Sequence, residues 1–161
     1  MTITNRMRST IAVIAGAVAV MTVAIPAATA NASVGSISPA SLSVSGATNG
    51  LRTVSVSGVV RTSSAAEASQ LYNNGYRVVY RLWGDDPVSD DLLWDTSYMS
   101  DYSAEPDGLH FSNVLVLRSS FLNEDTCWCD NRDEVYAGIR LINSSGSTSR
   151  SAESNRVLGY F

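Results

Sequence analysis

The amino-acid sequence predicts an all-β fold, an antiparallel β-sandwich of about seven strands with one short helix. Three observations indicate this fold class. Apolar and polar residues alternate over several short runs, which is the period of a strand with one buried face. Loop segments rich in Ser, Gly, Asn and Asp separate these runs. Only one segment has a helical start signal and helical spacing.

The first 32 residues have the composition of a secretory signal peptide. Arg6 and Arg8 precede an almost entirely apolar run over residues 11–25, which is shorter than the ~20 residues of a membrane-spanning helix. Small residues around Ala30 and Ala32 fit a cleavage site. We therefore expect residues 1–32 to be removed, the protein to be secreted, and no stable membrane anchor to remain. An uncleaved N-terminal anchor is the alternative.

Two parts are expected after the signal peptide. Residues 33–50 are rich in Ser, Gly and Ala and form a flexible lead with a weak first strand, and residues 51–161 form the β-sandwich domain. Within that domain the alternation predicts strands over residues 51–60, 76–83, 92–99, 109–117, 135–142 and 156–161.

The segments between these strands carry turn and cap signals. Ser64 and Glu67 have the spacing of a capping box, and Asn74-Gly75 is a helix stop, so a short helix is expected between them. Pro106-Asp107-Gly108 predicts a tight turn. Residues 143–154 are expected to form a polar loop.

Charge limits the partners of the protein. The formal net charge is −4, and without residues 1–32 nine arginines stand against fifteen acidic residues, giving −6. A phosphate backbone is bound by basic patches, so a nucleic-acid partner is not expected.

Acidic residues are concentrated between residues 84 and 134, in two clusters. The first cluster spans residues 84–91 and the second spans residues 123–134, and each lies beside a predicted strand. Calcium takes six to eight oxygen ligands, which carboxylates on neighbouring loops can supply. If the two loops meet at one end of the sandwich, we expect a calcium site. Its metal ligands would come from Asp85, Asp86, Asp90, Asp91, Glu124, Asp125, Asp130 and Asp133. The alternative is a solvated acidic rim that is neutralised by arginines.

Cys127 and Cys129 flank Trp128 inside the second acidic cluster. In an oxidising compartment they are expected to form a small disulfide, which would push Trp128 outward for binding a partner. A redox role or an intermolecular bridge is the alternative.

The sequence favours a binding or structural module over an enzyme. His110, the only histidine, lies within a predicted strand, and a Gly-x-Ser-x-Gly nucleophile motif is absent. We expect an extracellular module whose partner is an unknown protein or glycan, because aromatic residues near carboxylates can hold sugars or cationic side chains. A small secreted hydrolase that uses the loop carboxylates is the alternative.

Overall fold

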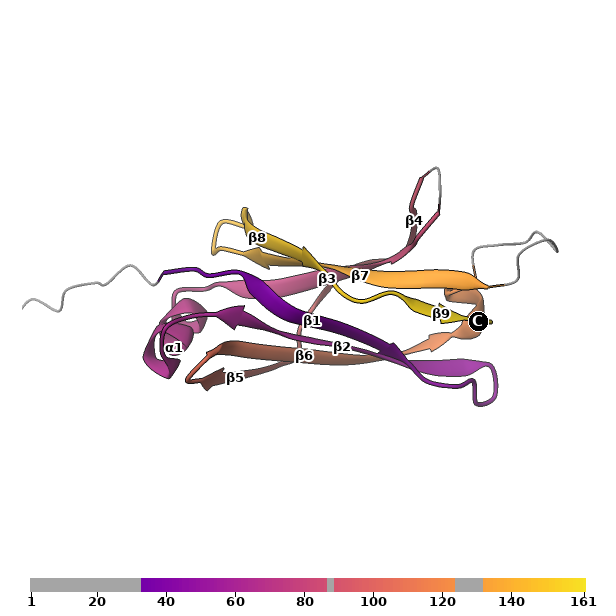
Figure 1. Cartoon of the computed structure of the whole chain (residues 1–161), viewed down its shortest axis with the longest axis horizontal. Coiled ribbons are helices and arrows are strands. Elements are labelled where there is room, and N and C mark those ends of the chain that lie inside the picture. Colours follow the sequence, from indigo (N-terminus) through magenta and orange to yellow (C-terminus); the bar gives the residue numbers. More distant parts are fainter. Residues whose placement is uncertain (1–32, 87–88, 124–131) are drawn as a thin grey trace, which may run out of the picture. The chain divides into compact units, whose positions relative to one another are not determined.

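The computed structural model describes residues 33–86, 89–123 and 132–161, which form two antiparallel sheets in a sandwich-like arrangement (Figure 1). Sheet A has the strand order β1 (Ile37–Val44), β2 (Leu51–Arg61), β6 (Gly108–Arg118) and β5 (Asp101–Glu105). Sheet B has the order β4 (Asp91–Tyr98), β3 (Arg77–Gly84), β7 (Asp133–Ile142) and β8 (Thr148–Glu153), and β9 (Val157–Gly159) also pairs with β7. The expected all-β class, with antiparallel sheets and one short helix, is therefore confirmed.

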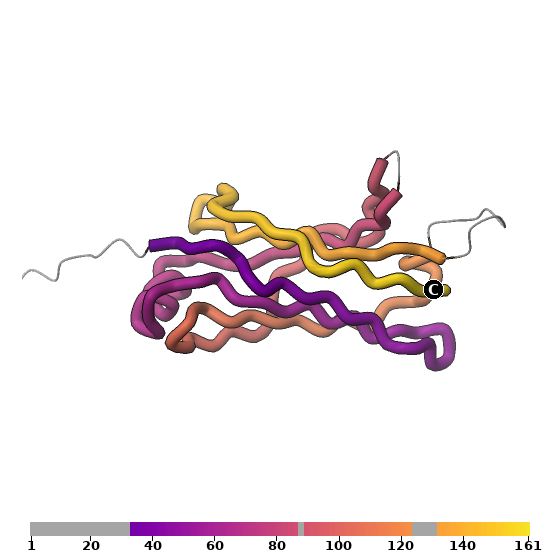
Figure 2. Tube along the Cα trace, in the orientation of Figure 1, coloured from indigo at the N-terminus to yellow at the C-terminus, as the bar shows by residue number. Residues whose placement is uncertain are grey.

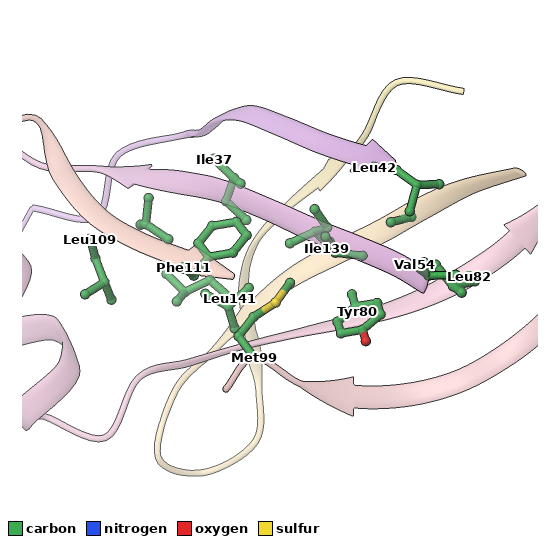
Figure 3. Close-up of a cluster of buried hydrophobic side chains, with 14 of the residues drawn as sticks. Ile37, Leu42, Val54, Tyr80, Leu82, Met99, Leu109, Phe111, Ile139 and Leu141 are labelled. Carbon is green, nitrogen blue, oxygen red and sulfur yellow. The ribbon is translucent and has the colours of Figure 1, made fainter. Parts of the chain in front are cut away.

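Alternate residues of the inner strands point between the two sheets and form the core (Figure 3). Val54 of β2, Leu82 of β3 and Ile139 of β7 are completely buried. Tyr80 is also buried, and its hydroxyl accepts a hydrogen bond of 2.8 Å from the Asn113 side chain of the opposite sheet. This bond satisfies a buried polar atom, so the apolar core tolerates the tyrosine hydroxyl.

The predicted runs correspond to β2, β3, β4, β6, β7 and β9, but two other strands were missed. Residues 143–154 were predicted as a polar loop, yet β8 occupies their second half. In β5 only Tyr102 and Ala104 pack against the core, and in β8 only Ala152 does. Both are edge strands held by pairing with one neighbour, so they carry little of the apolar alternation that marks an inner strand. The described residues therefore contain nine strands rather than about seven.

The single described α-helix, α1 (Ala65–Asn73), lies beside β5 and β6 at one end of the sheets (Figure 1). The Ser64 side chain accepts a hydrogen bond of 3.3 Å from the Glu67 backbone N–H, as the capping box predicts. The Glu67 carboxylate, however, accepts bonds from the backbone and hydroxyl of Ser63, one residue earlier than expected. These hydrogen bonds lower the pKa of Glu67. Across the described ranges, no helix is long and apolar enough to cross a membrane.

The edge of sheet A is joined to sheet B by Asn155, which lies between β8 and β9. Its side-chain amide accepts a hydrogen bond of 2.9 Å from the Leu42 backbone N–H and donates one of 3.0 Å to the Leu42 carbonyl oxygen. Figure 2 shows the C-terminal segment running beside β1. We call these two contacts the Asn155 bridge, and they make the expected weak first strand an integral edge of the fold.

Candidate functional site

The structure brings the described parts of the two acidic segments to the same end of sheet B. In the register of β3 and β7, Gly84 lies opposite Val135. The Asp85 backbone N–H donates a hydrogen bond of 2.8 Å to the Glu134 carbonyl oxygen. The first acidic loop therefore begins directly beside the start of β7.

Two carboxylates of the first loop contact groups of sheet B and its C-terminal edge. Arg156 forms an ion pair with Asp85, lies 3.7 Å from the Glu153 carboxylate and stacks over the Tyr136 ring at 4.9 Å from its centroid. The Tyr136 hydroxyl donates a hydrogen bond of 2.6 Å to Asp90. Part of the acidic charge is thus neutralised within the chain.

Of the other six proposed metal ligands, three lie within the described residues and three lie outside them. Asp133 is 2% exposed at the start of β7, Asp86 lies just after β3, and both make contacts within the protein, while Asp91 is exposed at the start of β4. Outside the described residues lie the three ligand candidates Glu124, Asp125 and Asp130. The segment with Cys127, Trp128 and Cys129 also lies outside them. Among residues 33–86, 89–123 and 132–161, no group of three or more His, Cys, Asp or Glu side chains could hold a metal ion. The calcium site, the disulfide and the role of Trp128 stay predictions.

A groove on the outer face of sheet B is the feature that sequence reasoning missed. Its volume is about 620 Å³. The lining comes from β3, β7 and β8 and consists of Arg81, Trp83, Tyr136, Gly138, Ile139, Arg140, Ser151, Ala152 and Glu153. We call it the Trp83 groove.

Gly138, at the centre of this face, has no side chain and leaves room for the Trp83 indole. The register places Gly138 between Arg81 of β3 and Glu153 of β8. A Cβ atom at Gly138 would lie 3.0 Å from the Nε1 atom of Trp83, so the half-exposed indole reaches over the glycine. A glycine inside an alternating strand is a sign of close approach by another group, and Gly138 is the signal in the sequence that could have pointed to this face.

The polar groups of the groove differ in whether they already have partners. Arg81 donates a hydrogen bond of 2.9 Å to Thr96 and lies 3.2 Å from the Asp95 carboxylate. The Thr96 backbone N–H lowers the pKa of Asp95, and Arg81 lowers it further. Within the part of the chain that the structure describes, the Arg140 guanidinium has no ion pair and the Trp83 indole N–H has no acceptor. These two groups are available to a ligand.

Tyr136, at the end of the groove, should make the stability of the protein sensitive to alkaline pH. Burial and the hydrogen bond to Asp90 raise the pKa of Tyr136 above that of an unfolded tyrosine, which is about 10. The folded state then holds this proton when the unfolded state has lost it. The contribution of this proton to the free energy of unfolding is fully present below pH 10 and is lost as the pH rises above that value. We expect Tyr136→Phe to flatten the fall in unfolding free energy between about pH 9 and pH 12.

Urea unfolding at a series of pH values measures this effect. Tyr160→Phe is the matched control, because Tyr160 is 67% exposed. Tyr80 and Tyr102 also have raised pKa values owing to burial, so some alkaline sensitivity should remain in the variant. An unchanged pH profile in Tyr136→Phe would contradict the assignment.

A second hollow, of about 530 Å³, lies on sheet A and includes His110. The His110 Nε2 atom lies 2.7 Å from Asp107, which also forms an ion pair with Arg61. The hydrogen bond with His110 is the main cause that lowers the pKa of Asp107.

His110 is a half-buried residue of β6, as expected, and Ser103 lies opposite it on β5. Among the described residues, no serine hydroxyl is hydrogen-bonded to His110.

The comparisons with known proteins add no relative to this description. Neither the family models, nor the curated proteins, nor the solved structures include a match to the chain.

Proposed function

We propose that the protein is an extracellular binding module, a β-sandwich that holds a sugar chain in the Trp83 groove. The observation that carries this proposal is the groove of about 620 Å³ on the outer face of sheet B, which is lined by the half-exposed Trp83 indole lying over Gly138. Glycine weakens a strand interior, where β-branched residues are preferred. The volume lies within the usual range of ligand pockets. At Gly138 the missing side chain makes room for the Trp83 indole, which lines the groove.

The chemistry of the groove fits a sugar better than a purely apolar ligand. An indole offers a flat apolar face on which the C–H face of a sugar ring can stack. Ser151 and Glu153 line one side of the groove and supply a hydroxyl and a carboxylate for sugar hydroxyl groups. The extracellular location rests on the composition of residues 1–32.

Removing the indole should abolish most of the binding. We expect Trp83→Ala to weaken the affinity for a bound glycan about tenfold or more, because the stacking surface is lost. A glycan array followed by isothermal titration with the best ligand measures this effect. Gly138→Val is a second variant, which retains the tryptophan but places side-chain atoms against its indole, and it should reduce binding as well.

The matched control is Trp94→Ala. Trp94 lies on β4 outside the groove, packs edge-on against Phe121 and donates its indole N–H to Ser97. This variant should bind like the unchanged protein if it remains folded by circular dichroism. Absence of glycan binding, or full binding by both groove variants, would overturn the proposal.

A further inference from the structure

We infer that the sugar chain is acidic and that Arg140 binds its carboxylate groups. This inference rests on the proposed function and specifies its ligand class. Arg140 lies on the outer face of β7, between Val79 of β3 and Ser151 of β8. Along the strand it is two residues from Gly138, a separation of about 7 Å. Arg140 and the Trp83 indole N–H therefore reach the same hollow from two sides.

The groove is lined by two cations, Arg81 and Arg140, and only Arg81 has a carboxylate partner among the described residues. Arg81 is engaged by Asp95 and Thr96, and the Glu153 carboxylate lies 3.7 Å from Arg156. In the described residues, Arg140 is a half-buried cation without a carboxylate partner. A guanidinium can bind a carboxylate through two parallel hydrogen bonds, and such bonds are about twice as strong as neutral ones. A ligand carboxylate would give Arg140 the partner that it does not have among the described residues.

A uronic acid fits this arrangement because its carboxylate is attached to the sugar ring itself. The ring can stack on Trp83 while the carboxylate reaches Arg140, only a short distance along β7. An acidic peptide fits less well. Its extended backbone would gain affinity by pairing with a free strand edge, whereas β7 is paired on both sides, with β3 and with β8.

The overall charge of the protein works against a general attraction to polyanions. The chain has a formal net charge of −4, so a polyanion is repelled at long range. Binding of an acidic glycan would then depend on local contacts with Arg140 and Trp83 rather than on a general attraction.

Isothermal titration of the purified protein with oligogalacturonate tests the inference, and the methyl-esterified oligomer serves as the uncharged comparison. We expect binding of the acid form and a loss of about tenfold to a hundredfold on esterification. Arg140→Gln should produce a loss of similar size, and Arg140→Lys a smaller one because the fork geometry is lost while the charge remains.

Arg118→Gln is the matched control. Arg118 is an exposed arginine at the end of β6 in sheet A, so the variant changes the net charge equally and leaves the groove intact. Its affinity should equal that of the unchanged protein. Equal binding of acid and ester would overturn the acidic ligand class and leave the proposed function standing. Binding of neither would overturn the acidic ligand class, while the glycan array decides separately whether the proposed function stands.

Two further outcomes would overturn the inference, and the second of them would overturn the proposed function as well. Full affinity of Arg140→Gln for the acid form would remove Arg140 from the site. Binding of polyglutamate with the same dependence on Arg140 would assign the groove to acidic peptides instead of glycans.

Discussion

Replacement of Leu82 by alanine should lower the free energy of unfolding by about 3 kcal/mol, the typical cost of a cavity in a packed core. Leu82 is completely buried on β3, an inner strand of sheet B that pairs with β4 on one side and β7 on the other. Sheet A covers its inner face, so the surrounding side chains have little freedom to fill the space (Figure 3). Denaturant unfolding followed by tryptophan fluorescence measures this loss.

Val116→Ala is the control for Leu82→Ala. Val116 also lies on a strand, but it is 62% exposed on the outside of β6. Its truncation should change the unfolding free energy by less than about 0.5 kcal/mol. Equal losses in the two variants would contradict the assignment of Leu82 to the core.

Gly108→Ala should also destabilise the protein by about 3 kcal/mol, for a reason that lies in the backbone. Gly108 begins β6 after the predicted Pro106-Asp107 turn and has a φ of +151°, which L residues rarely adopt. A Cβ atom at this position would lie 2.3 Å from the Val60 carbonyl oxygen and 2.8 Å from a methyl group of Val59. The strand would have to move away from β2.

Two other glycines separate the effect of a positive φ from the effect of steric overlap between an added Cβ atom and its neighbours. Gly50 has a φ of +72°, and a Cβ atom added there would meet nothing within 4 Å, so Gly50→Ala should cost about 1 kcal/mol from backbone strain alone. Gly46 has similar open space without a positive φ, and Gly46→Ala should be nearly neutral. Melting temperatures of the three variants test this order. A Gly108 variant no less stable than the Gly50 variant would contradict the close approach to β2.

The inner strands could be predicted from the sequence because burial on one face imposes alternation. Val78, Tyr80 and Leu82 point inward as the pattern indicates, and Ile139 and Leu141 do the same on β7. The edge strands β5 and β8 could not be predicted in this way. Backbone pairing with a single neighbour holds them, and such pairing leaves little trace in side-chain composition.

Prediction of the candidate site from the sequence meets a similar limit. The density of acidic residues drew attention to the loops, and the structure does place Asp85 beside Glu134. The Trp83 groove depends instead on residues that are far apart along the chain. Gly138 lies beside Trp83 only because of the register between β3 and β7. The alternation over residues 76–83 puts Trp83 on the face opposite Tyr80 and Leu82, but pairing between distant strands is needed to recognise the hollow.

The Asn155 bridge has a consequence for how copies of the protein behave in concentrated solution. An unpaired strand at the border of a sheet is a template on which further chains can add, which is a route to fibrils. At Leu42 of β1, both outward backbone groups are already bonded to the Asn155 amide. An incoming strand would have to displace this side chain before it could pair there, so the bridge opposes aggregation at that border.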